Sequence, residues 1–135
     1  MRKLKVRAWD ITESKWIEIN KIGFLDNGKA WYVEDHEKTD PPYFTDINDW
    51  ALMHYTGLKD KNSKEIYEGD IVWCPWKGEK FIIEWDEIGT GYLFHNVDYK
   101  ERTHGIDYYE FEDMCASLGF EVIGNIYENP ELINS

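Results

Sequence analysis

Short apolar segments with the spacing of strands recur along most of this chain, and that pattern restricts its fold more than any other feature. Near the N-terminus, Leu4, Val6 and Ala8 fall on one face of a predicted strand. Successive side chains of a strand point to opposite faces of a sheet, so such a segment buries one face and exposes the other. The pattern returns at residues 16–19, which predicts a hairpin around the polar segment 10–15.

A second hairpin is predicted around Asn27-Gly28, which separates apolar runs at residues 23–25 and 30–33. Asn and Gly tolerate the positive φ angles of a type I′ turn, whose twist suits antiparallel strands. The sequence therefore indicates a type I′ hairpin at this position.

The rest of the chain continues the same pattern. Further strands are predicted at residues 52–56, 70–74, 81–85, 92–94 and 120–127. Pro75 is expected to end its strand, and residues 97–105 are predicted to form a loop. Short helical turns are predicted at residues 46–50, at 112–118 before Gly119, and at Asn129-Pro130 with Asn129 as the cap.

Many short strands separated by regular turns favour a barrel or sandwich over alternating β and α units. The predicted fold class is mainly β: a small barrel or roll with extra hairpins and one or two short helical turns. A chain of 135 residues fits one domain, predicted to span 1–135. Aromatic residues make up 16% of it, which argues against disorder and for an aromatic core.

Cysteine usage and hydropathy point to the cytoplasm. Cys74 and Cys115 are the only two cysteines and lack C-x-x-C spacing, so buried thiols are expected rather than a disulfide scaffold or zinc site. No apolar run approaches the ~20 residues that span a bilayer, and no signal core follows the basic N-terminus. A cytoplasmic protein with no membrane partner is therefore expected.

The charge is strongly negative and unevenly distributed. The net charge is −12, and residues 84–135 hold 12 acidic residues against only Lys100 and Arg102. Nucleic-acid binding needs cations that replace the counterions of the phosphates, so direct binding is not expected. An alternative function is that the acidic part mimics DNA and inhibits a host DNA-binding protein.

Three segments resemble the YopX-like family of phage and prophage proteins. They are KLKVRAWD at residues 3–10, YTGLKDKNSKEIYEGDIV at 55–72 and VIGNIYENPEL at 122–132. The resemblance implies an SH3-like β-barrel arrangement in a protein of the host bacterial cytoplasm, and it implies no catalytic residues. One departure is Ser63, where the family usually has Gly after Asn. All three segments can also be explained by folding alone. For example, Val122, Gly124 and Ile126 are predicted to share one face of a strand, where Gly124 permits close backbone approach.

Candidate metal sites are weak in this sequence. Residues 60–65 begin like a calcium loop, but Lys64 and Glu65 stand where that loop needs an oxygen ligand and Gly. An ordinary turn is predicted there instead. None of the four histidines has zinc-motif spacing. His95 and His104 would have to meet across a loop and join Glu110 or Asp113.

A further alternative function is a hydrolase that uses a metal or a pair of carboxylates. Two groups of acidic side chains, each around an aromatic residue, suggest it, since paired carboxylates can act as acid and base. They are Glu84, Asp86 and Glu87 around Trp85, and Glu110, Glu112 and Asp113 around Phe111. No nucleophile elbow, phosphate loop or dinucleotide fingerprint occurs, so no catalytic residue and no cofactor are predicted.

Trp73, Trp76 and Trp85 surround one predicted hairpin, and some of them are expected to face outward. Exposed aromatic residues with an acidic rim fit a protein partner or a second copy of the chain. The sequence thus favours a non-catalytic interaction module that binds a host or phage protein, with homo-oligomerisation as an open alternative.

Overall fold

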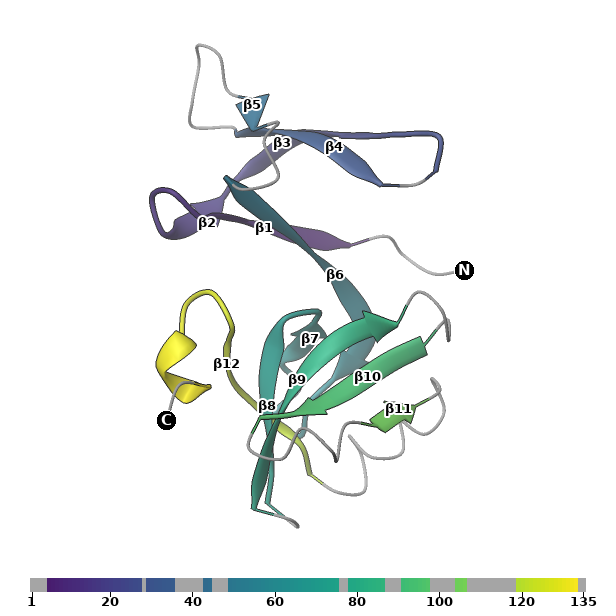
Figure 1. The fold of residues 1–135 in the computed structure, drawn as a ribbon, viewed down its shortest axis with the longest axis vertical. Helices are drawn as coiled ribbons and strands as arrows, with labels where there is room; N and C mark the ends of the chain where they lie inside the picture. Colours follow the sequence, from purple (N-terminus) through teal and green to yellow (C-terminus); the bar gives the residue numbers. More distant parts are fainter. Residues whose placement is uncertain are drawn as a thin grey trace. The chain divides into compact units, whose positions relative to one another are not determined.

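The computed structural model describes residues 5–27, 29–35, 43–44, 49–75, 78–86, 91–97, 104–106 and 119–133. Strands dominate these residues, and the helical structure among them is one short 3-10 turn (Figure 1). One sheet curls into half a barrel and extra hairpins accompany it, so the predicted mainly-β class is confirmed.

The chain divides into two compact units, one of residues 5–54 and one that contains residues 55–135. The long strand β6 (Trp50–Lys59) runs from the first unit into the second. Its first half pairs with a strand of the first unit and its second half with a strand of the second. That residues 1–135 behave as one domain stays a prediction, for which cooperative unfolding is the test.

In the first unit, β1 (Val6–Asp10) pairs with β2 (Lys15–Ile17) and with β6. A separate sheet holds β3 (Ile19–Phe24), β4 (Ala30–Asp35) and β5 (Tyr43–Phe44) in that order. Both predicted hairpins are confirmed, since β1 pairs with β2 and β3 with β4. The core cluster of this unit consists of Ala8, Ile17, Val33 and Trp50, with Ile19, Ala30 and Leu52 packed against it.

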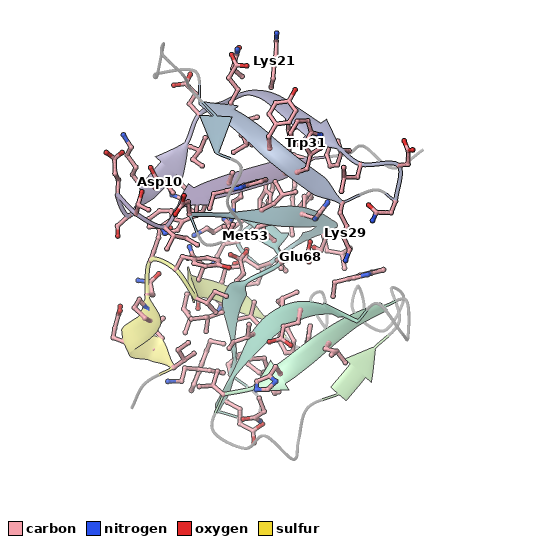
Figure 2. All side chains as sticks on the ribbon, turned by 45° about the horizontal axis from the view of Figure 1, so that its top comes forward. Asp10, Lys21, Lys29, Trp31, Met53 and Glu68 are labelled. Atoms are coloured by element: carbon pink, nitrogen blue, oxygen red, sulfur yellow. The ribbon has the colours of Figure 1, made fainter. Side chains whose placement is uncertain are left out.

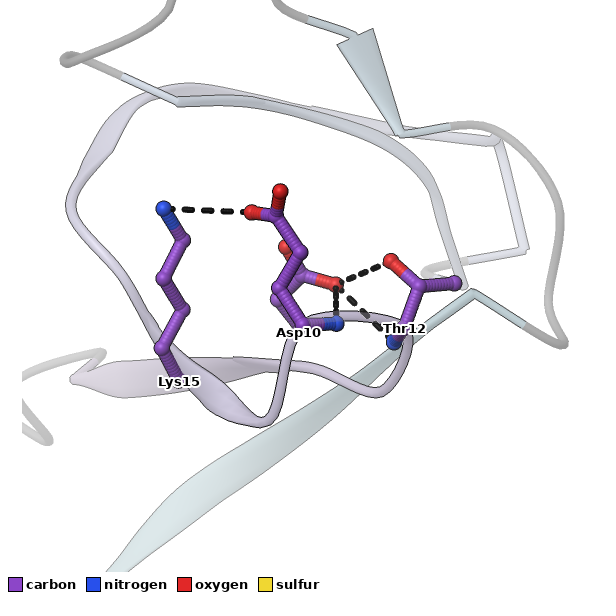
Figure 3. A network of polar contacts seen from close by, with 4 residues as sticks. Asp10, Thr12 and Lys15 are labelled. Atoms are coloured by element: carbon purple, nitrogen blue, oxygen red, sulfur yellow. Dashed lines mark hydrogen bonds and ion pairs between the residues drawn. The ribbon is translucent and has the colours of Figure 1, made fainter.

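A buried carboxylate closes the first hairpin. The Oδ1 atom of Asp10 accepts hydrogen bonds from the backbone N–H and hydroxyl of Thr12, at 3.0 and 2.7 Å, and from the N–H of Glu13 (Figure 3). Glu13 in turn lies 3.1 Å from the ammonium group of Lys15. The polar segment that sequence identified as a turn is thus ordered by its own side chains.

The turn between β3 and β4 differs from the predicted one. The N–H of Leu25 donates to the carbonyl of Lys29 at 2.8 Å, and the N–H of Lys29 donates to Oδ1 of Asn27 at 3.0 Å. Among the described non-glycine residues, only Ser14 and Ser63 have positive φ, so Asn27 does not. The predicted type I′ turn is therefore wrong, because the side chain of Asn27 satisfies the backbone of a longer loop.

The second unit contains a five-stranded antiparallel sheet in the order β11-β10-β9-β8-β12. Its strands are β8 (Asp70–Cys74), β9 (Glu79–Asp86), β10 (Gly91–Asn96), β11 (His104–Ile106) and β12 (Glu121–Asn125), while β7 (Glu65–Tyr67) pairs with β6. β8 ends before Pro75, as predicted. The predicted loop at 97–105 is wrong at its end, where β11 pairs with β10.

Three phenylalanine rings form the centre of this unit. Phe94 packs against Phe81 and Phe120, with ring centroids 5.7 and 5.1 Å away, and those two rings stack on each other at 6.2 Å. Ile66, Val72, Cys74, Ile83 and Val122 complete the buried cluster. The aromatic core expected from the composition is present, and Cys74 is a buried free thiol as predicted.

The last strand departs from strict alternation. Val122 pairs with Val72 and Gly124 pairs with Ile71, so Ile123 is an extra residue in a β-bulge. The predicted shared face of Val122, Gly124 and Ile126 is therefore wrong. Gly124 does permit a close approach, but what approaches is the side chain of Asn129 rather than another backbone: a Cβ atom at position 124 would overlap it.

The turn after β12 forms where it was predicted, as the 3-10 helix η2 (Pro130–Leu132). Asn129 does not cap it with its side chain. Its Oδ1 atom accepts from the N–H of Asn125 at 3.2 Å instead, so the capping prediction is wrong.

The predicted helical turn at 112–118 lies entirely outside the described residues. The one predicted at 46–50 is described only at its last two residues, of which Trp50 begins β6. Gly119 has the positive φ expected of the residue after a helix, at 65°.

The turn between β6 and β7 has an acidic residue at its centre. Oδ1 of Asp60 accepts from the N–H groups of Asn62 and Lys64, and Oδ2 accepts from the N–H of Val122 on β12, at distances between 2.8 and 2.9 Å. Residues 60–64 form a turn, as predicted. Backbone N–H groups bond to both carboxylate oxygens of Asp60, so these oxygens order the turn.

Ser63 occupies the left-handed region in this turn, with φ of 65°. A residue with a Cβ atom is strained there by about 1–2 kcal/mol, whereas Gly is not. We expect Ser63→Gly to raise the free energy of unfolding by about 0.5–1 kcal/mol, after the greater flexibility of Gly in the unfolded chain is subtracted. Urea denaturation measures the change. Ser63→Ala is the control, expected to be no more stable than the natural protein, and equal stability of the Gly and Ala variants would contradict the prediction.

Candidate interaction surfaces

The structure separates the tryptophans that the sequence grouped as an interaction surface. Trp73 on β8 pairs with Lys80 on β9, and directly paired residues point to the same face. Lys80 and Trp85 are an odd number of residues apart on β9, so Trp73 and Trp85 lie on opposite faces of the sheet. Trp73 is half-buried, Trp85 is 40% exposed, and Trp76 lies outside the described residues.

A group of exposed apolar residues lies at the tip of the β3–β4 hairpin. Phe24 is the last residue of β3, Leu25 follows it, and Trp31 lies near the start of β4. Their exposed fractions are 38%, 50% and 49%. Figure 2 shows Trp31 on this hairpin, together with the nearby Lys29. We call Phe24, Leu25 and Trp31 the hairpin tip.

The indole of Trp31 is held in place by the neighbouring ring of Tyr32. The ring of Tyr32 covers Gly23 on the neighbouring strand so closely that a Cβ atom at that position would overlap it. Trp31 then packs edge-on against Tyr32, with ring centroids 4.5 Å apart. An exposed aromatic side chain fixed in this way loses little conformational entropy when a partner covers it.

A bulge explains why Trp31 faces outward. Gly23 pairs with Tyr32 and Phe24 pairs with Ala30, so the pairing skips Trp31. Strict alternation would place Trp31 on the same face as the buried Val33, but Ala30 packs against the core cluster instead. Sequence reasoning missed this surface because a bulge has no clear pattern. The sequence did contain one indication of an exposed surface. Three large apolar residues lie within three positions of the Asn-Gly turn, where side chains are seldom covered.

A second aromatic group lies on β1 and β2. Trp16, 38% exposed, pairs with the buried Trp9, and their rings meet edge to face with centroids 4.9 Å apart. The guanidinium carbon of Arg7 lies 4.7 Å from the centre of the Trp16 ring. A cation over an indole face is attracted to it, so the Arg7 side chain already covers one side of this surface.

The residues of the alternative metal site are not brought together where the structure describes them. In the β10–β11 pairing, His104 is opposite Phe94 rather than His95. Glu110 and Asp113 lie outside the described residues. Within the described part of the chain, no three His, Cys, Asp or Glu side chains are grouped closely enough to hold a metal ion.

The carboxylates of the alternative hydrolase are only partly described. Glu84 is exposed, which is the usual state of a solvated acidic residue. The side chain of Asp86 and residues 87, 110, 112 and 113 lie outside what the structure describes.

Several acidic residues of the second unit are used inside the fold. Asp60 is 6% exposed, and Asp70 accepts a hydrogen bond from the N–H of Tyr67 at 2.7 Å. The buried Glu79 accepts from the amide of Asn96 at 2.8 Å. These charges stabilise the structure from within, and none of them belongs to residues 84–135, the acidic part from which the DNA-mimic alternative was drawn.

The phenol of Tyr127 is a further polar group of the second unit. Burial raises its pKa above the ordinary value, and the nearby carboxylate of Glu68 raises that pKa further. A phenol with a raised pKa keeps its proton at neutral pH, so Tyr127 is suited to donate a hydrogen bond and not to act as a base.

The comparisons with known proteins identify the family. The family model described as YopX protein matches residues 5–134, which is nearly the whole chain. The chain belongs to the YopX family. This confirms the resemblance seen at residues 3–10, 55–72 and 122–132. No curated protein matches the sequence.

Two solved structures resemble this YopX-family chain over almost its full length. Protein EF1440 from Enterococcus faecalis is 26% identical with a TM-score of 0.65, and the match covers 98% of this chain and 99% of that one. Protein yopX from Bacillus subtilis is 23% identical with a TM-score of 0.54, and 98% of each chain is covered. The fold is thus shared within the family. In the described part of this chain, no helix is long and apolar enough to cross a membrane.

Proposed function

We propose that this YopX-family protein is a non-catalytic interaction module of a phage or prophage, which binds a host or phage protein in the bacterial cytoplasm. The observation that supports it most is the hairpin tip. Monomeric proteins seldom gather large exposed apolar side chains at one place unless that place binds something. Trp85 adds an exposed indole in the other unit.

The chemistry of the hairpin tip favours a protein partner. Trp is enriched among the residues that contribute most to protein–protein binding, and it acts best when fixed and surrounded by other apolar contacts. Trp31 is fixed by its contact with Tyr32, and Phe24 and Leu25 add exposed apolar side chains to the same end of the hairpin. A nucleic acid is disfavoured, because the protein carries a net charge of −12.

The test uses the full chain as bait in lysates of cells in which the phage or prophage is active, followed by binding measurements with the purified partner. We expect Trp31→Ser to weaken that binding by about 30-fold or more, which is the loss typical of a central interface residue. Trp85→Ser shows whether the second unit contributes.

Glu18→Ser is the matched control, because Glu18 is an exposed residue of the same unit that carries no apolar surface. Circular dichroism establishes that each variant is folded. Equal affinity of all variants for the partner would exclude the hairpin tip as the binding surface. Self-association lost in Trp31→Ser, with no other protein bound, would replace the partner by a second copy of the chain.

A further inference from the structure

We propose that two copies of this chain pair through the outer edge of β3, strand against strand, about a two-fold axis at Ile22. The inference rests on the pairing within the β3-β4-β5 sheet and does not depend on a partner at the hairpin tip. β3 is the end strand of this sheet, and among the described residues it pairs with β4 alone. An end strand presents a row of N–H and C=O groups with which another chain can pair.

The outer edge of β3 is open in the part of the chain that the structure describes. There, the backbone hydrogen bonds of residues 21–24 are those of the pairing with β4. No residue of β3 is fully buried, and both Lys21 and Phe24 are exposed. The backbone groups on this edge are therefore accessible to a second strand without any rearrangement of the sheet.

The charge of β3 suits a second copy of the chain. Two copies of a protein with a net charge of −12 repel each other, so they meet most easily along a strand that carries no acidic side chain. β3 is such a strand, since Lys21 is the one charged residue in its sequence INKIGF. Its other side chains are neutral and impose no repulsion on an identical strand.

Alternation and charge together select one register. Ile22 pairs with the buried Val33 and faces the core, whereas Lys21 pairs with Glu34 on the opposite face. Antiparallel copies keep both faces only when a residue on one face is opposite a residue of the same face. A two-fold axis at Lys21 satisfies this rule but puts two ammonium groups directly opposite each other, which is unfavourable. An axis at Gly23 pairs only residues 22–24, whereas the axis at Ile22 pairs residues 20–24.

The selected register also brings complementary groups together. It places Lys21 of one copy opposite Gly23 of the other, where the ring of Tyr32 covers the missing side chain. Figure 2 shows Lys21 extending away from the sheet, which leaves its ammonium group able to lie over that ring. A cation is attracted to an aromatic face. On the opposite face, the half-buried Ile22 side chains of the two copies cover each other.

The pairing leaves both hairpin tips accessible. Antiparallel strands run in opposite directions, so the two tips lie at opposite ends of the shared sheet. A dimer that presents the same binding surface twice gains avidity for a partner with repeated sites. This last consequence rests on the proposed function, whereas the pairing itself does not.

The experiment is sedimentation velocity on the purified full chain over a series of concentrations. We expect the mass to rise from one chain to two and no further, because a two-fold pair is closed. Ile22→Lys and Ile22→Glu should each weaken self-association at least about tenfold, since each puts like charges directly opposite at the axis. An equimolar mixture of these two variants should associate again. Trp31→Ser should leave the dimer intact, which separates this contact from the hairpin tip.

Ile22→Cys tests the contact with a small apolar side chain, in case a charge at this position unfolds the sheet. Directly opposite residues of antiparallel strands lie within disulfide distance, so mild oxidation should link two Ile22→Cys chains. Glu18→Cys, on an exposed residue just before β3, is the control and should not cross-link at the same concentration. A natural chain that stays monomeric at every concentration would overturn the inference. So would equal cross-linking of the two cysteine variants, or a dimer that Trp31→Ser abolishes.

Discussion

Replacement of Asp60 by Ala is expected to lower the free energy of unfolding by about 3–4 kcal/mol, because three backbone N–H groups lose a charged acceptor in a buried place. Two of these groups belong to the turn itself, at Asn62 and Lys64, and the third belongs to Val122 on β12. The side chain thus joins segments that lie about sixty residues apart in the sequence. Urea denaturation followed by far-ultraviolet circular dichroism measures the loss.

Two variants make the Asp60 result interpretable. Asp60→Asn keeps the shape and one carbonyl acceptor, so it should lose about half as much stability as Asp60→Ala. Asp26→Ala removes an acidic residue from an exposed loop and should change stability by less than about 0.5 kcal/mol. A loss of less than 1 kcal/mol in Asp60→Ala would mean that water satisfies these N–H groups and that the carboxylate does not order the turn.

The role of Asp60 shows where sequence reasoning ends. Asp and Asn between two strands predicted a turn in which side chains bond to nearby backbone, and the bonds to Asn62 and Lys64 confirm that local part. The bond to Val122 could not be predicted, because it depends on how β12 is placed beside the turn. Local hydrogen bonding is determined by spacing, whereas contacts between distant segments depend on topology.

The strands themselves were predictable because their physical cause is local. A continuous apolar run after Gly69-Asp70 identified the strand at Asp70–Cys74 to the residue, and Pro75 marked its end. The error in face assignment falls on a bulge, at Ile123, where one extra residue reverses the faces that simple alternation assigns. A bulge arises from the fit of two paired strands, and a single sequence shows only one strand at a time.

The sequence predicted the type of residue on the candidate surface but not its position in the fold. Composition indicated exposed aromatic residues in an acidic protein, and Trp85 has that exposure. The hairpin tip was missed because its exposure results from the bulge at Trp31 and from the ring of Tyr32 over Gly23. Both features are tertiary, so the amino-acid pattern alone favoured the tryptophans around β8 and β9.

Replacement of Phe94 by Ala is expected to remove about 4 kcal/mol of stability, since truncation of a fully buried aromatic ring leaves a cavity that the surroundings only partly fill. Phe94 is 1% exposed and contacts the rings of both Phe81 and Phe120. Phe94→Leu keeps most of the volume and should lose about 1.5 kcal/mol. Similar losses for the two variants would show that the ring stack, rather than the volume it fills, holds this core together.

The same variant tests whether residues 1–135 form one cooperative domain. β6 supplies paired strand residues to both units, to β1 through Trp50–His54 and to β7 through Tyr55 and Lys59. Loss of the Phe94 core should release β7 and the second half of β6, and the first half of β6, which pairs with β1, would then fray from that end. Hydrogen exchange in Phe94→Ala should therefore rise in the first unit as well as in the second. Unchanged protection at Ala8 and Ile17 would instead make the two units independent domains, each stabilised by its own cluster.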